Sequence, residues 1–103
     1  MSRKVCVVTG SSSGIGAATA PLYASHGWNV VVNYSRKPEP AEAVAAECRA
    51  LGVDVLVVRA DVSQDADCRA MAQQVQDAGG RVDVLVNNAG TTRFANIDRK
   101  SVV

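Results

Sequence analysis

The chain has 103 residues, enough for one small domain, and a formal net charge of +1. Its 11 basic and 10 acidic residues are interspersed, which excludes the charge pattern of a nucleic-acid or anionic-membrane partner. The apolar stretch behind the basic start Met1–Lys4 is broken at Thr9-Gly10. It is too short for a signal peptide or a membrane span, so a cytoplasmic protein without a membrane partner is expected.

The first elements are an apolar strand, a glycine turn and a helix. The β-branched run Val5–Val8 leads into residues 9–16, which read Thr-Gly-Ser-Ser-Ser-Gly-Ile-Gly. A helix is expected from about Ile15 to His26, where Gly27 stops it. Such a turn lets a pyrophosphate approach backbone N–H groups at the positive end of a helix dipole. A turn of the same composition without a ligand is the alternative, because three glycines alone are weak evidence.

The second strand is predicted around Val30–Val32, and the following helix begins near Pro40 and ends before Gly52. The intervening segment, residues 33–37, reads Asn-Tyr-Ser-Arg-Lys. It contains two bases and no acid, although dinucleotide sites that take NAD usually carry an acid about 20 residues after the glycines. A polar solvated loop is the alternative interpretation.

The third strand is predicted at Val55–Val58 and is followed by Asp61. Ser63 is the expected N-cap of the next helix, which stops before Gly79-Gly80. The carboxylate of Asp61 has two candidate roles, in helix capping and in ligand binding. One role does not exclude the other.

The fourth strand, Val82–Val86, runs into Asn87-Asn88-Ala89-Gly90. This motif, the glycine turn of residues 9–16 and Asp61 together resemble the short-chain dehydrogenase/reductase family over about the first 97 residues, closest in pattern to its 3-oxoacyl thioester reductases. The resemblance implies an α/β, Rossmann-type doubly wound parallel sheet of order 3-2-1-4, truncated after the fourth strand. The nucleotide would lie above the carboxyl ends of the strands, where the strand order reverses.

The resemblance also implies a set of cofactor-binding residues. In this set Asp61 accepts a hydrogen bond from the adenine amino group, while Ser35 and Arg36 hold a ribose 2′-phosphate. The expected cofactor is therefore NADP, with NAD the less favoured choice. The residues are Gly10, Ser12, Ser13, Gly14, Ile15, Gly16, Tyr34, Ser35, Arg36, Asp61, Val62, Asn87, Ala89 and Gly90.

No catalytic residue is assigned. Members of the family use a serine and a Tyr-x-x-x-Lys motif, but the only tyrosines here are Tyr23 and Tyr34, and Gly27 and Pro38 stand four residues after them. The resemblance implies a longer parent protein, expected to be a homo-oligomer, that transfers hydride between the cofactor and a small-molecule carbonyl or secondary alcohol. A non-enzymatic nucleotide-binding module is the alternative.

Residues 1–97 are expected to form the amino-terminal half of this domain, and residues 98–103 a non-native or disordered tail. The tail residues match one reading frame of a common sequencing-library adapter, while a natural basic tail is the alternative; resequencing the encoding locus would distinguish the two. Without a neighbouring strand, Val82–Val86 would leave an open sheet edge and make the chain prone to association.

The side chains that could form disulfides or bind a metal include three cysteines and one histidine. Cys6, Cys48 and Cys68 are far apart in the sequence and form no Cys-x-x-Cys pair. Reduced thiols are expected in a chain of this kind, and His26 alone does not indicate a metal site.

Overall fold

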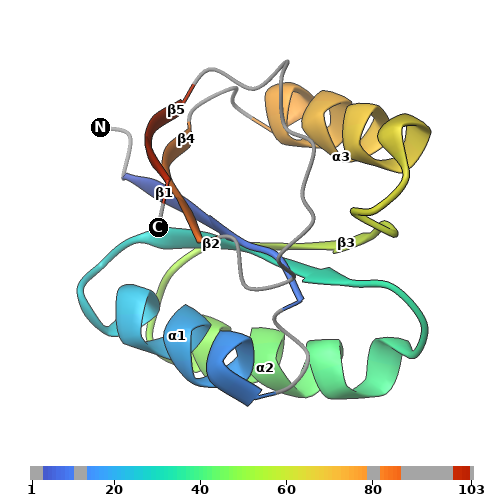
Figure 1. Cartoon of the computed structure of the whole chain (residues 1–103). Coiled ribbons are helices and arrows are strands. Elements are labelled where there is room, and N and C mark those ends of the chain that lie inside the picture. The colour runs from blue at the N-terminus through green and yellow to red at the C-terminus, as the bar shows by residue number, and fades with distance from the viewer. Residues whose placement is uncertain (1–3, 11–13, 79–81, 87–98, 103) are drawn as a thin grey trace.

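The structure, a computed structural model, describes residues 4–10, 14–78 and 82–86, and the backbone of residues 99–102. Strands and helices alternate along the chain (Figure 1). The elements are β1 (Val5–Val8), α1 (Gly14–Ser25), β2 (Asn29–Tyr34), α2 (Pro38–Ala50), β3 (Val55–Arg59), α3 (Asp65–Asp77), β4 (Val82–Val86) and β5 (Arg99–Val102).

All pairs of neighbouring strands are parallel, and the sheet order is β3-β2-β1-β4-β5. The predicted order 3-2-1-4 is therefore confirmed. In the register, Val7 of β1 lies between Val31 of β2 and Leu85 of β4. β-Branched residues suit these central strands because both faces of a parallel sheet are covered, so little alternation of polar side chains is needed.

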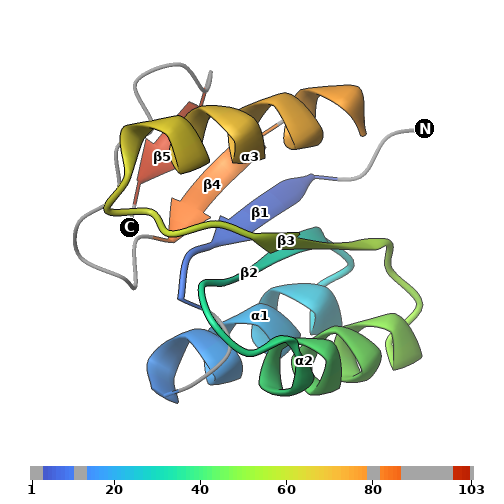
Figure 2. The same ribbon diagram turned by 90° about the vertical axis from the view of Figure 1, so that its right-hand side faces the viewer.

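Helices cover both faces of the sheet. Figures 1 and 2 show α1 and α2 side by side on one face and α3 on the other. On the α3 face, Val7, Val31 and Val58 pack with Met71 of the helix. On the opposite face, Val8 and the small helical residues pack into a second core. Small residues such as Ala20, Ala24, Ala41 and Ala45 let the two helices approach the sheet closely.

The helix boundaries agree with most of the turn residues. Gly27 and Gly52 follow α1 and α2 with φ values of 84° and 89°, a conformation that glycine adopts without a steric penalty. Pro21 lies inside α1 and does not end it. The expected N-cap of the third helix is wrong, however. Gln64 is the N-cap of α3, because the hydroxyl of Ser63 donates to the carboxylate of Asp61 instead.

The last described residues form a further strand of the sheet. Arg99–Val102 forms β5, which pairs in parallel with β4 and places Arg99 opposite Val82. The sheet therefore continues beyond its fourth strand, and the outer edge of β4 is paired. Strands pair through backbone hydrogen bonds, which residues of many types can form. The polar sequence Arg-Lys-Ser-Val therefore shows no apolar pattern that would predict a strand. The native or non-native origin of residues 98–103 stays a prediction.

Candidate functional site

The site lies at the carboxyl end of the sheet, where the chain reverses its direction of strand addition. From β1 the chain adds β2 and β3 on one side and then returns to add β4 on the other. Thr9, the residue after β1, is fully buried at this point. Its backbone N–H donates to the carbonyl of Val86 at 3.0 Å, and its hydroxyl donates to the same oxygen at 3.3 Å. Thr9 therefore joins the ends of β1 and β4 where a ligand crevice is expected in an open parallel sheet.

The glycine turn leaves β1 directly above this point. Gly10 and Gly14 have φ values of 61° and 57°, in the left-handed region that side chains with a Cβ rarely adopt. A Cβ built on Gly14 meets no atom of the described residues within 4 Å, so they leave the space beside it open. Gly16 is buried in the first turn of α1, whereas the Ile15 side chain is 75% exposed. The turn therefore brings the amino end of α1 to an open position at the switch point.

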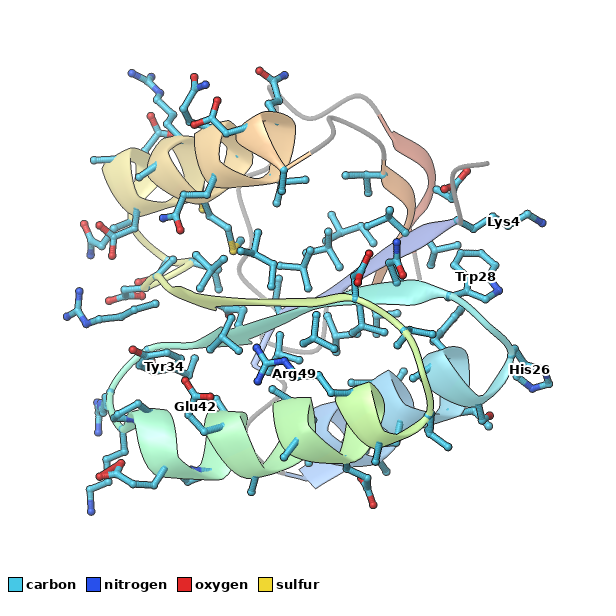
Figure 3. All side chains as sticks on the ribbon, turned by 180° about the vertical axis from the view of Figure 1, so that it is seen from behind. Lys4, His26, Trp28, Tyr34, Glu42 and Arg49 are labelled. Carbon is cyan, nitrogen blue, oxygen red and sulfur yellow. The ribbon has the colours of Figure 1, made fainter. Side chains whose placement is uncertain are left out.

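The end of β2 supplies the second part of the site. Tyr34 is its last residue, and the exposed Ser35 and Arg36 follow it. In Figure 3, Tyr34 lies at the opposite end of the sheet from Lys4 and Trp28. The lysine ammonium of that distant pair lies 5.4 Å from the Trp28 ring centroid.

The end of β3 lies against this segment. The register pairs Tyr34 with Arg59, and the N–H of Ala60 donates to the carbonyl of Tyr34 at 2.8 Å. This contact brings the exposed Arg59 into the neighbourhood of Ser35 and Arg36, a placement that the sequence analysis missed. The sequence shows Arg59 as a basic residue at the end of the apolar run Val55–Val58. Only the register between β2 and β3 shows that it lies beside the loop that follows Tyr34.

Asp61 lies just beyond β3 and organises its own loop. Its carboxylate accepts the N–H of Ser63 at 3.0 Å and the Ser63 hydroxyl at 2.6 Å. Its own N–H donates to the carboxylate of Asp67 at 2.8 Å. Two of these three bonds satisfy backbone donors in the loop ahead of α3. Neither donor belongs to α3, which starts at Asp65 and has no side-chain capping bond from its N-cap Gln64, so the capping role of Asp61 stays a prediction. The next residue, Val62, is buried in the core with Cys68 and Met71.

The pKa of the Asp61 carboxyl is lowered from its usual value of 3.8. The Ser63 hydroxyl is the main cause, followed by the Ser63 N–H. Burial opposes them, and the positive charges of Arg36 and Arg59 are the weakest causes and lower the pKa. Asp61 is therefore ionised at neutral pH and can accept hydrogen bonds. Arg36 and Arg59 both lie close enough to Asp61 for their charges to act on its carboxyl.

Replacing Ser63 by alanine is expected to raise the pKa of Asp61 toward its usual value, because the strongest hydrogen bond to the ionised form is lost. Since the folded-state pKa lies below the unfolded one, ionised Asp61 stabilises the fold above pH 3.8 and this contribution is lost as the pH falls through the folded-state pKa. An NMR titration of the Asp61 carboxyl carbon measures the shift. Ser25→Ala, which removes a hydroxyl donating to the Leu22 carbonyl, is the control, and an unchanged Asp61 pKa in Ser63→Ala would contradict the assignment.

The structure does not test the remaining predicted site residues. They lie outside the described residues and comprise Ser12, Ser13, Asn87, Ala89 and Gly90. The other predicted site residues lie at the carboxyl end of the sheet, at or next to the turns after β1, β2 and β3. They are Gly10, Gly14, Ile15, Gly16, Tyr34, Ser35, Arg36, Asp61 and Val62.

Reactive groups outside this site are few among the described residues. All three cysteines are buried and unpaired, and burial raises the pKa of the Cys6 thiol to about 12, so that it stays protonated. Within residues 4–10, 14–78, 82–86 and 99–102, no group of three or more His, Cys, Asp or Glu side chains is placed to hold a metal ion. Nor is any helix of these residues long and apolar enough to cross a membrane.

The fold and the site define a class of protein, an α/β domain with a glycine turn at the switch point of a parallel sheet. The family model described as short chain dehydrogenase matches residues 4–102, and the chain belongs to this family.

The relatives are oxidoreductases by name. The chain is 47% identical over 90 residues to 3-oxoacyl-(acyl-carrier-protein) reductase FabG of Staphylococcus aureus, covering 87% of this chain and 37% of the relative. Acetoin dehydrogenase YohF of Salmonella typhimurium matches with a TM-score of 0.76 and 37% identity over 82% of this chain and 35% of that one. Acetoin dehydrogenase of Enterobacter cloacae matches with a TM-score of 0.78 and 33% identity, over 84% of this chain and 34% of that one. The chain spans little more than a third of these proteins.

Proposed function

We propose that this chain binds a nicotinamide dinucleotide, NADP in preference to NAD, as the nucleotide-binding part of a short-chain oxidoreductase. The observation that carries the proposal is a pair of left-handed glycines at the switch point of the sheet, Gly10 after β1 and Gly14 at the start of α1, where the space beside Gly14 is open among the described residues. Backbone N–H groups at the start of α1 would bind the pyrophosphate, favoured by the helix dipole. The sequence resemblance adds Asn87, Ala89 and Gly90 to this proposal.

The preference for NADP rests on charge at the ends of β2 and β3. Ser35 and Arg36 follow Tyr34, and the register sets Arg59 beside them. A 2′-phosphate would gain two guanidinium partners there, which form charge-assisted hydrogen bonds with phosphate. The segment from Asn33 to Lys37 contains no carboxylate that would repel this phosphate.

The reaction of the whole protein is part of the same proposal. The cofactor would supply hydride chemistry with a carbonyl or secondary alcohol, and the residues of this chain would bind and orient it. The sequence has no Tyr-x-x-x-Lys, so the proton transfer that accompanies the hydride is not assigned to any residue here. We place the protein in the cytoplasm because its three cysteines are unpaired, as is usual in a reducing compartment. The homo-oligomeric parent and the association of this chain stay predictions.

The cofactor preference is tested by titrating NADPH and NADH into the chain and following the fluorescence of the reduced nicotinamide. We expect NADPH to bind at least about tenfold more tightly, equivalent to one good charged hydrogen bond, and Arg36→Ala to lose most of this preference. Arg49→Ala is the matched control, because it removes the same charge from the last turn of α2, where Arg49 contacts the carbonyl of Val55. Equal affinities for the two nucleotides in the wild type would refute the preference.

A further inference from the structure

Asn33 is a buried polar residue next to the end of β2. Its exposed fraction is 2%, and it lies on the sheet face that also bears Val31 and packs against α3, since residues two apart in a strand share a face. A carboxamide at such a position costs free energy unless its donors and acceptor are all satisfied. Its partners therefore show what it does.

Those partners come from three different chain segments. The carbonyl Oδ1 of Asn33 accepts the backbone N–H of Gly10 at 3.0 Å. The amide Nδ2 donates to the carbonyls of Ala60 at 3.1 Å, Val58 at 3.3 Å and Tyr34 at 3.3 Å. One side chain thus connects the glycine turn after β1 to the ends of β2 and β3.

Asparagine suits this position because it combines one acceptor oxygen with two N–H donors. Aspartate could still accept from Gly10, but its ionised carboxylate would face three carbonyl oxygens. Alanine would leave the Gly10 donor and the strand-end carbonyls without this partner. The position therefore requires both halves of the carboxamide.

The contact to Gly10 acts at the point where the turn begins. Gly10 is the first left-handed residue after β1, and the bond to its N–H fixes the peptide plane from which the turn starts. The contacts to Val58 and Ala60 act on the strand end that leads directly to Asp61. Both segments belong to the candidate site, although Asn33 itself points into the core side of the sheet.

We propose that Asn33 is a positioning residue that holds the glycine turn and the end of β3 in their nucleotide-binding geometry before the nucleotide arrives. This inference rests on the proposed function and names a residue that acts on the site through Gly10 and Ala60. A site held in its binding conformation in advance spends less of its binding free energy on ordering the protein.

The test compares Asn33→Ala with Asn29→Ala. Asn29 is the first residue of the same strand, and its side-chain oxygen accepts the N–H of Asp54 at 3.0 Å, at the end of the sheet away from the site. Two quantities are measured at a temperature where every variant is folded, namely NADPH affinity and hydrogen exchange of the Gly10 amide. We expect Asn33→Ala to weaken NADPH binding about tenfold and to speed hydrogen exchange of the Gly10 amide about as much. This is the effect of losing one to two net hydrogen bonds. Asn29→Ala should leave both quantities unchanged.

Asn33→Asp supplies a second measurement if the alanine variant fails to fold. A protonated aspartic acid can both accept from Gly10 and donate to a strand-end carbonyl, whereas the ionised form can only accept. Relative to the wild type at each pH, this variant should bind NADPH weakly near neutral pH and recover as the pH falls. A flat ratio across the pH range would count against the inference.

The outcomes separate the inference from the proposed function. If the wild type binds NADPH and Asn33→Ala binds it equally well with unchanged Gly10 exchange, the positioning role is wrong and the proposed function stands. Equal losses in Asn33→Ala and Asn29→Ala would also overturn the role, because the effect would then be general destabilisation. If the wild type binds neither NADPH nor NADH, the proposed function fails and the inference fails with it.

Discussion

Gly14→Val is expected to lower the affinity for NADPH by about a hundredfold or more, because a side chain would occupy the space through which the pyrophosphate approaches the turn. Gly14 has a φ of 57°, and a Cβ there meets no atom within 4 Å in the part of the chain that the structure describes. The strain of a β-branched residue in the left-handed region costs about 1–2 kcal/mol, so the variant should still fold. The effect on binding should therefore be larger than the effect on stability.

Gly52→Val is the matched control for this prediction. Gly52 has a φ of 89° and the same empty surroundings, but it follows α2 far along the chain from the glycine turn. Both variants should lose similar amounts of stability in a chemical denaturation experiment, while only Gly14→Val should lose NADPH binding. Unchanged affinity in Gly14→Val, or an equal loss in both variants, would contradict the proposed position of the pyrophosphate.

Met71→Ala is expected to reduce the free energy of unfolding by about 3 kcal/mol, as for other large-to-small substitutions in a core. Met71 of α3 has no exposed surface and packs against Val7, Val31 and Val58 on one face of the sheet. A small domain has a total stability of only about 5–15 kcal/mol, so this loss is a large share of it. Urea denaturation followed by far-ultraviolet circular dichroism measures the change.

Gln73→Ala provides the comparison for Met71→Ala. Gln73 lies two residues further along α3 on its exposed side, where its amide donates to the Asp77 carboxylate at 2.9 Å. Removing an exposed contact of this kind should change the stability by less than about 0.5 kcal/mol. A loss below about 1 kcal/mol in Met71→Ala would show that α3 is not packed on the sheet as the structure places it.

Much of the fold could be predicted because its signals are local. β-Branched runs marked β1 to β4, and Gly27 and Gly52 marked the ends of two helices. The error at Ser63 arose because Asp61, two residues earlier, competes for its hydroxyl. The strand at residues 99–102 had no signal in the sequence, because its pairing with β4 depends on a neighbouring strand and not on an apolar pattern in Arg-Lys-Ser-Val.

For this protein the sequence by itself determined the strand and helix pattern, the family resemblance and the glycine turn, because each depends on residues close together in the chain. The tertiary structure alone decided which distant groups meet. Thr9 bonds to Val86, Asn33 to Gly10 and Ala60, and Tyr34 lies opposite Arg59. Backbone carbonyls and N–H groups carry no sequence signature, so a side chain that binds them reveals its partners only after the crossovers and the strand register have brought those segments together.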